Sequence, residues 1–126
     1  MRATAFVNEE GSTLVYVPWS GINIFPESNT TAYTRFHAPY DGYIKEIIVH
    51  THDSATSGTC TITPNINGTA KTSQQETISG TAGVKTAFTF GAAGYSFSNG
   101  NPIYLEFDRE SADRARGYAF TIVLII

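Results

Sequence analysis

The stretch Gly117-Tyr118-Ala119-Phe120-Thr121-Ile122-Val123-Leu124-Ile125-Ile126 contains almost no polar side chain. A strand with one hydrated face alternates apolar and polar residues, and here Thr121 is the only clear break in the apolar run. We therefore predict a strand whose two faces both need cover, which is easier when a second subunit helps. This favours an assembled structural protein, whose oligomer interface would contain Tyr118, Phe120, Ile122, Leu124 and Ile126.

The composition indicates one domain without a charged partner. A chain of 126 residues is long enough to bury a core of its own. Charged residues make up only 15% of it, below the roughly 25% of ordinary soluble domains, and Thr, Ser, Asn and Gly replace them. The net charge of −3 gives no electrostatic reason to expect a nucleic acid or an anionic membrane as partner. The single cysteine, Cys60, precludes an internal disulfide, and we expect its side chain to be buried.

The two ends of the sequence carry no targeting or membrane signal. The first ten residues lack the apolar region of a signal peptide, since Glu9 and Glu10 follow directly after Val7-Asn8. The apolar C-terminal stretch is too short for a membrane-spanning helix, which needs about 20 residues. We expect a protein that is made in a cytoplasm and stays soluble.

Short β-type runs separated by turn residues recur along the chain. Asn67-Gly68 is the strongest hairpin signal, because a type I′ turn needs positive φ at both central residues. Pro64 predicts that its strand is an edge strand or is bulged at that point. The predicted runs are 13–17, 31–37, 43–50, 59–66, 69–73 with a continuation to 78 left open, 84–90, 103–108 and 117–126.

About eight or nine strands at regular spacing predict an all-β fold, a single antiparallel, jelly-roll-like β-sandwich. We expect residues 1–12 to form an N-terminal arm and residues 13–126 to form the sandwich. The aromatic and apolar segment 19–26 is either a loop over one open end of the sandwich or a contact with another chain; a platform that stacks on a ligand is a lesser alternative. The candidate capsid or partner contacts are Phe6, Trp19, Ile22, Ile24 and Phe25.

His50-Thr51-His52-Asp53 is the densest group of potential metal ligands. His50 and His52 point to the same face of an extended strand, but a metal site needs a further ligand that the sequence does not identify. We interpret the group as a polar strand end and predict no metal and no other cofactor.

Carboxylates gather near the end of the penultimate predicted strand, at Glu106, Asp108 and Glu110. Paired carboxylates can act as acid and base in catalysis, but basic residues surround these three. No hydrolase elbow, nucleotide-binding loop or Cys-x-x-Cys motif is present, so we predict that the protein is not an enzyme. The mixed charges instead predict ion pairs that fix the register between subunits, made by Arg109, Asp113, Arg114 and Arg116.

Aromatic residues divide into a core set and a surface set. Five phenylalanines at strand positions are expected in the core, and five tyrosines are expected to be partly exposed. Tyrosine rings on a β-sandwich can stack on sugars, but tyrosine is also enriched at protein interfaces, and we rank the interface first. The two sets are Phe36, Phe88, Phe90, Phe107 and Phe120, and Tyr33, Tyr40, Tyr43, Tyr95 and Tyr104.

The order of strands and turns over about residues 31–107 resembles that of small virion proteins of tailed bacteriophages. A strand is followed by Ala38-Pro39-Tyr40-Asp41-Gly42 and then by a second strand. A later strand ends in Asn65-Ile66-Asn67-Gly68, and Phe97-Ser98-Asn99-Gly100-Asn101-Pro102-Ile103 comes after it.

The resemblance implies a structural virion protein with a jelly-roll-like fold. We expect a capsid decoration (cement) protein that binds the outer capsid surface as a small symmetric oligomer, a trimer, and stabilises the shell. Its partners would be copies of itself and the major capsid protein or another virion protein, and its location would be the virion. The alternative is a head or knob subunit of a tail fibre or spike that binds a host receptor or a carbohydrate.

Overall fold

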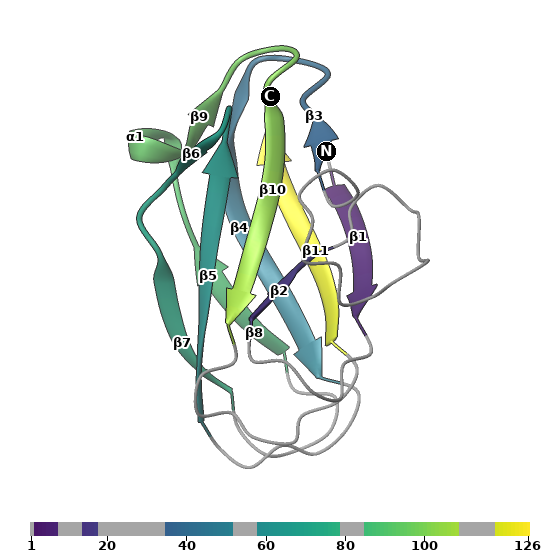
Figure 1. The fold of residues 1–126 in the computed structure, drawn as a ribbon, viewed down its shortest axis with the longest axis vertical. Helices are drawn as coiled ribbons and strands as arrows, with labels where there is room; N and C mark the ends of the chain where they lie inside the picture. The colour runs from purple at the N-terminus through teal and green to yellow at the C-terminus, as the bar shows by residue number, and fades with distance from the viewer. Residues whose placement is uncertain (1, 8–13, 18–34, 52–57, 79–84, 109–117) are drawn as a thin grey trace.

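The computed structural model describes residues 2–7, 14–17, 35–51, 58–78, 85–108 and 118–126 (Figure 1). Nearly all of these residues are extended, as the β-branched and aromatic runs predicted. The elements are β1 (Arg2–Val7), β2 (Leu14–Tyr16), β3 (Phe36–His37), β4 (Gly42–Thr51), β5 (Gly58–Ile66), β6 (Thr69–Ala70), β7 (Gln74–Ile78), β8 (Lys85–Thr89), α1 (Ala92–Tyr95), β9 (Ser96–Phe97), β10 (Pro102–Asp108) and β11 (Tyr118–Ile125).

Two antiparallel sheets pack against each other, which confirms the predicted all-β sandwich (Figure 1). Sheet A has the order β1-β11-β4-β8, with β9 also paired to β4. Sheet B has the order β2-β10-β5-β6, with β3 paired to β10 and β7 paired to β5. The chain crosses between the sheets from β1 to β2, β3 to β4, β4 to β5, β7 to β8, β9 to β10 and β10 to β11, as in a jelly-roll-like sandwich.

β1 belongs to the sandwich and is not part of an arm. All six of its residues pair with β11, from Arg2 opposite Val123 to Val7 opposite Tyr118. The prediction of an arm over residues 1–12 is therefore wrong for residues 2–7, and residues 8–12 lie outside the described residues. Local polarity hid this strand, because its partner is at the other end of the sequence.

The Asn67-Gly68 hairpin forms as predicted. Asn67 has a φ of 52° and Gly68 a φ of 77°, the positive values that a type I′ turn requires. The flanking residues pair as Ile66 opposite Thr69 and Asn65 opposite Ala70. The backbone N–H of Asn67 also donates to the Pro102 carbonyl over 2.9 Å, so the turn is tied to β10.

Pro64 lies in an inner strand, so the edge-strand alternative is wrong. β5 pairs with β10 on one side and with β6 and β7 on the other. On the second side the pairing with β7 stops at Ile62, and the pairing with β6 begins at Asn65. Thr63 and Pro64 thus have no ladder partner on the side of β6 and β7, whereas the pairing with β10 continues through Pro64 without a register shift, so no bulge is seen there. The Pro64 carbonyl accepts a hydrogen bond from the Lys71 N–H over 2.8 Å.

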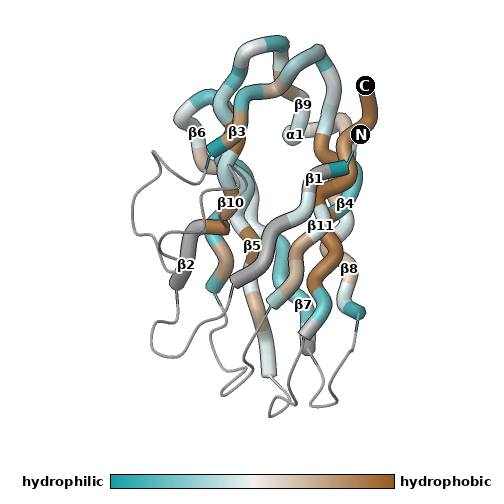
Figure 2. Tube along the Cα trace, turned by 90° about the vertical axis from the view of Figure 1, so that its right-hand side faces the viewer, coloured by the Kyte–Doolittle hydropathy of each residue, from teal (hydrophilic) through white to brown (hydrophobic). Residues whose placement is uncertain are grey.

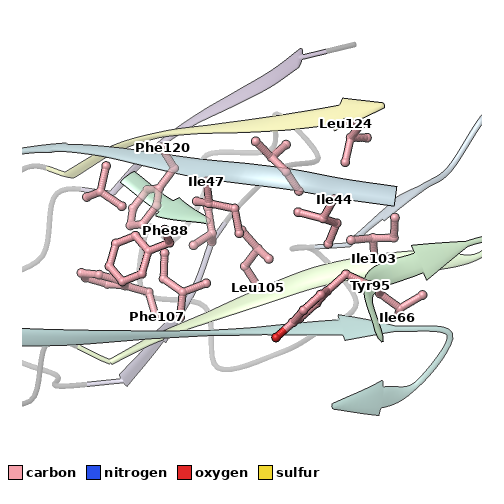
Figure 3. Packing of buried hydrophobic residues seen from close by; sticks show 14 of the residues in the cluster. Ile44, Ile47, Ile66, Phe88, Tyr95, Ile103, Leu105, Phe107, Phe120 and Leu124 are labelled. Carbon is pink, nitrogen blue, oxygen red and sulfur yellow. The ribbon is translucent and has the colours of Figure 1, made fainter. Parts of the chain in front are cut away.

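Side chains from both sheets fill the space between them (Figure 3). Phe107 of sheet B packs its ring edge-to-face against Tyr118 and Phe120 of sheet A, with centroids 4.8 and 5.0 Å apart. Such ring pairs contribute about 0.5–1.5 kcal/mol beyond area burial. Of the predicted core phenylalanines, Phe88, Phe107 and Phe120 are fully buried, and Phe36 and Phe90 are partly buried against the cluster.

Two further predictions concern single side chains. Cys60 is fully buried on β5, as predicted. Tyr95, expected to be partly exposed, is only 8% exposed. Its hydroxyl donates to the Thr72 carbonyl over 2.8 Å, and its ring lies edge-to-face on Phe90 at 4.8 Å, so it links the segment before β7 to α1.

Candidate functional site

The predicted oligomer-interface residues lie mostly in the core of one chain. Tyr118, Phe120, Ile122 and Leu124 are at most 1% exposed. The prediction that these four side chains form an interface between subunits is wrong, because side chains buried this deeply in one chain have no surface left for another. Ile126, the fifth, is 63% exposed and remains a candidate.

The other predicted contact residues are mostly outside the described part of the chain. Phe6 lies on β1 with its backbone opposite Ala119, and its side chain is not described. The remaining predicted contacts and interfacial charges stay predictions: Trp19, Ile22, Ile24, Phe25, Arg109, Asp113, Arg114 and Arg116.

The candidate metal and acid residues are not brought together. His50 is exposed on β4 in sheet A, whereas Glu106 and Asp108 lie on β10 in sheet B. His52, Asp53 and Glu110 lie outside the described residues. In the parts of the chain that the structure describes, no three His, Cys, Asp or Glu side chains form a group that could hold a metal ion.

The outer face of sheet A is built around an uncharged row on β11. Ala119 is exposed, Thr121 and Ile125 are half-buried, and Val123 is 8% exposed. Figure 2 shows hydrophobic residues along β11 and part of β4. The neighbouring strands extend this face. Thr4 of β1 and Ile48 of β4 lie opposite Thr121, on its two sides, and Ala87 of β8 lies opposite Ile48. We call these outward side chains of sheet A, together with Arg2, Tyr43, Lys45, Glu46, His50, Lys85 and Thr89, the outer face of sheet A.

The outer face of sheet B is polar. Across β5 and β10, Thr61 lies opposite Asp108, Thr63 opposite Glu106, and Asn65 opposite Tyr104. The Asn65 amide, on a residue 3% exposed, donates to the Thr63 carbonyl and to Glu106 Oε1, both over 3.4 Å. Thr63 Oγ1 and Ser73 Oγ share a hydrogen bond of 2.7 Å. These hydroxyl, amide and carboxylate groups can bind a polar ligand or water, and we call them the outer face of sheet B.

Two turns that are far apart in the sequence are locked together at one end of the sandwich (Figure 1). Asp41 Oδ1 accepts a hydrogen bond from the Asn99 N–H over 2.7 Å. The Ala38 N–H donates to the Asn101 carbonyl over 2.9 Å, and the Gly100 N–H donates to the Ala38 carbonyl over 2.7 Å. We call this region, residues 38–42 and 97–102, the locked end.

Gly42 joins the locked end to the end of β11. A Cβ at Gly42 would collide with the Ile125 carbonyl oxygen and would lie 3.1 Å from Cζ of Phe97. Only glycine permits this close approach. The end therefore presents Tyr40, 59% exposed, and Ile126, 63% exposed, which are the exposed large hydrophobic residues in the described part of the chain.

The residues of the locked end are those of the turn motifs on which the resemblance to phage virion proteins depends. The sequence shows each motif as a separate turn. Nothing in it indicates that Asp41 and the backbone of Asn99 are hydrogen-bonded, because the contact spans 58 positions.

In the described residues no helix is long and apolar enough to cross a membrane.

Comparisons with known proteins identify no relative by sequence. No protein-family model matches the chain, and no curated protein matches it. Among solved structures, the chain is similar to a carbohydrate-binding module CBM36 in complex with calcium and xylotriose, with a TM-score of 0.46, 13% identity, and coverage of 97% of this chain and 78% of that one. It is also similar to the globular domain of the zebrafish complement 1qA protein, with a TM-score of 0.49, 12% identity, and coverage of 99% and 96%.

A third similar structure is that of infectious bursal disease virus, Gx strain, with a TM-score of 0.38, 14% identity, and coverage of 97% of this chain and 29% of that one. At such identities the likeness concerns the fold alone. We transfer no residue role from any of these proteins.

Proposed function

We propose that the protein is a non-catalytic structural component of a virus particle, a capsid decoration protein that binds the outer capsid surface as a small symmetric oligomer. Its action would be mechanical. Many copies would bridge neighbouring capsid subunits, and the surface buried at each contact would raise the free energy needed to open the shell.

The observation that carries this proposal is the locked end. Two turns and the end of β11 are fixed to each other through Asp41, Gly100 and Gly42, so their exposed side chains are held on a rigid support. Rigid exposed apolar groups suit a permanent protein contact, because little conformational entropy is lost when they bind. Tyr40 and Ile126 are the groups that we assign to the particle contact.

The low charge of the chain supports the same proposal. Only 15% of the residues are charged, and apolar or uncharged polar side chains occupy much of the surface of sheet A. Protein interfaces are depleted of charged residues at their centres. A surface of this kind suits stable contact with other subunits of a particle.

The proposal is tested by counting copies of the protein in purified virus particles from cells that carry this sequence, with quantitative mass spectrometry. We expect hundreds of copies per particle. Complete absence from particles would refute the proposal. A Tyr40→Ala variant should be incorporated at reduced copy number, and the matched Thr77→Ala variant, on the exposed strand β7, should be incorporated like the wild type.

A second candidate function is carbohydrate binding by a head or knob subunit of a tail fibre. The outer face of sheet B favours it, because Tyr104 lies beside the ordered amide of Asn65, and Glu106 and Thr63 follow in the next pair. An aromatic ring beside fixed donors and acceptors is the arrangement that a sugar ring requires.

Glycan-array binding separates the two candidates. The carbohydrate hypothesis requires that the isolated wild-type protein binds a defined glycan and that Tyr104→Ala loses this binding. A few copies or a few dozen copies per particle would also favour the second candidate, because a tail appendage is present in small numbers. Hundreds of copies without glycan binding would exclude the second candidate.

A further inference from the structure

The outer face of sheet A has the properties of a contact between protein subunits. Along all eight residues of β11, no charged side chain occurs, and the outward positions are Ala119, Thr121, Val123 and Ile125. A strand whose outer face is hydrated would normally carry polar or charged residues at these positions. The core of the same chain uses the inward positions, while Ala119 is exposed, Thr121 and Ile125 are half-buried, and Val123 is 8% exposed.

The row across the middle of this face is also uncharged. This row runs across the four strands, from Thr4 of β1 through Thr121 of β11 and Ile48 of β4 to Ala87 of β8. Ala87 is exposed and Ile48 is half-buried. Small exposed side chains beside a partly exposed isoleucine form a shallow surface that a second sheet can approach closely.

Charged residues occur in the rows on either side of the middle row, and they have both signs. Arg2 and Glu46 flank Val123 in one row, and the exposed Lys45 lies beside Glu46 at the bulge of β4. His50 and Lys85 lie in the other row. A copy of the same face therefore brings both an acidic and a basic group to the contact. A partner with only one sign of charge would place a like charge against either Glu46 or Arg2.

The size of the face fits one side of a protein interface. Eight residues at about 3.4 Å and four strands at about 4.8 Å give a flat area of roughly 500 Å². The accessible area is larger than the flat area because side chains project from it. A standard interface buries about 800 Å² on each partner, so this face can supply most of one.

From these observations we infer that the outer face of sheet A is the surface through which copies of this chain associate with each other. The inference rests on the oligomer in the proposed function but not on the particle that the oligomer would bind. The sequence placed the subunit contact on the inward residues of β11. We now place it on the outward residues of the same strand, Ala119, Thr121, Val123 and Ile125.

Light scattering coupled to size-exclusion chromatography tests this inference on the full chain at micromolar concentrations. The wild type should elute as an oligomer, with a mass of two or more times the mass of one chain. Ala119→Arg places an unpaired charge at an exposed outward position of β11, in the row next to the middle one, so association should weaken by roughly 100-fold and the monomer should dominate. Ala87→Arg, also at an exposed position, provides an independent variant.

Thr77→Arg is the matched control, since Thr77 is exposed on β7 in sheet B. It should keep the wild-type mass, and the circular dichroism spectra of all three variants should match the wild type. A wild type that is monomeric at every concentration would overturn the inference, as would an unchanged mass in both Ala119→Arg and Ala87→Arg. A monomer that still occurs in particles would overturn this inference alone, and an oligomer that is absent from particles would overturn the proposed function alone.

Discussion

The two outer faces of the sandwich differ more than the two inner faces do. Both inner faces are lined by aliphatic and aromatic side chains that meet in one core. Outside, sheet A presents alanine, threonine, valine and isoleucine along β11, whereas sheet B presents threonines, Asn65, Glu106 and Asp108. Strand β10 alternates apolar and polar residues, and β11 does not.

This difference is the reason for which we infer a subunit contact on the outer face of sheet A. A core needs only one apolar face of each strand, and β10 meets that need with Ile103, Leu105 and Phe107 inward and polar residues outward. β11 meets it with its even-numbered residues. Its apolar odd-numbered residues therefore point to a contact, and the polar face of sheet B points to water or a polar ligand.

The largest expected effect separates the two faces of β11 themselves. Ile122→Asp should unfold the protein or cost about 4 kcal/mol of unfolding free energy, because it puts a carboxylate into a fully buried site without a partner. Urea denaturation followed by circular dichroism measures this.

The neighbouring substitution is the matched control. Thr121→Asp lies on the half-buried outer face, so it should stay folded and act only on association. If Ile122→Asp were as stable as Thr121→Asp, the assignment of the inward and outward faces of β11 would be wrong.

A smaller effect is expected where sheet A meets the locked end. Gly42→Ala should lower the unfolding free energy by about 2 kcal/mol, because the new Cβ collides with the Ile125 carbonyl and one of the two strands must move. The shift of the urea midpoint at an unchanged slope gives the value.

Gly91→Ala provides the comparison for this variant. Gly91 has a φ of 179°, which any residue adopts, and no atom lies within 4 Å of a Cβ built there. Its stability should stay within about 0.5 kcal/mol of the wild type. Equal stabilities of the two alanine variants would show that Gly42 does not hold β11 against the locked end.

The smallest expected effect lies on sheet B. Thr63→Val removes the hydroxyl that is hydrogen-bonded to Ser73 and should cost about 0.5 kcal/mol, because water replaces much of an exposed hydrogen bond. The oligomer mass should not change, since the inferred subunit contact is on sheet A. A change of oligomer mass in Thr63→Val would contradict the inference that the subunit contact is on sheet A and not on sheet B.

Local signals predicted the features that depend on a few consecutive residues. The Asn67-Gly68 hairpin, the buried Cys60 and the buried Phe88, Phe107 and Phe120 all follow from turn chemistry or from alternation. The features that were missed depend on residues far apart. β1 was not recognised because its partner β11 is at the other end of the sequence, and the bond from Asn99 to Asp41 was not recognised because each turn is complete on its own.

The sequence alone determined that this is an antiparallel β-sandwich and that its last strand is apolar on both sides. Only the tertiary structure decided which side of that strand enters the core. A period of two residues separates the faces of a strand, but when both faces are apolar it does not say which one the second sheet will cover. That choice follows from the pairing of β11 between β1 and β4 and from the packing of Phe107 against Tyr118 and Phe120.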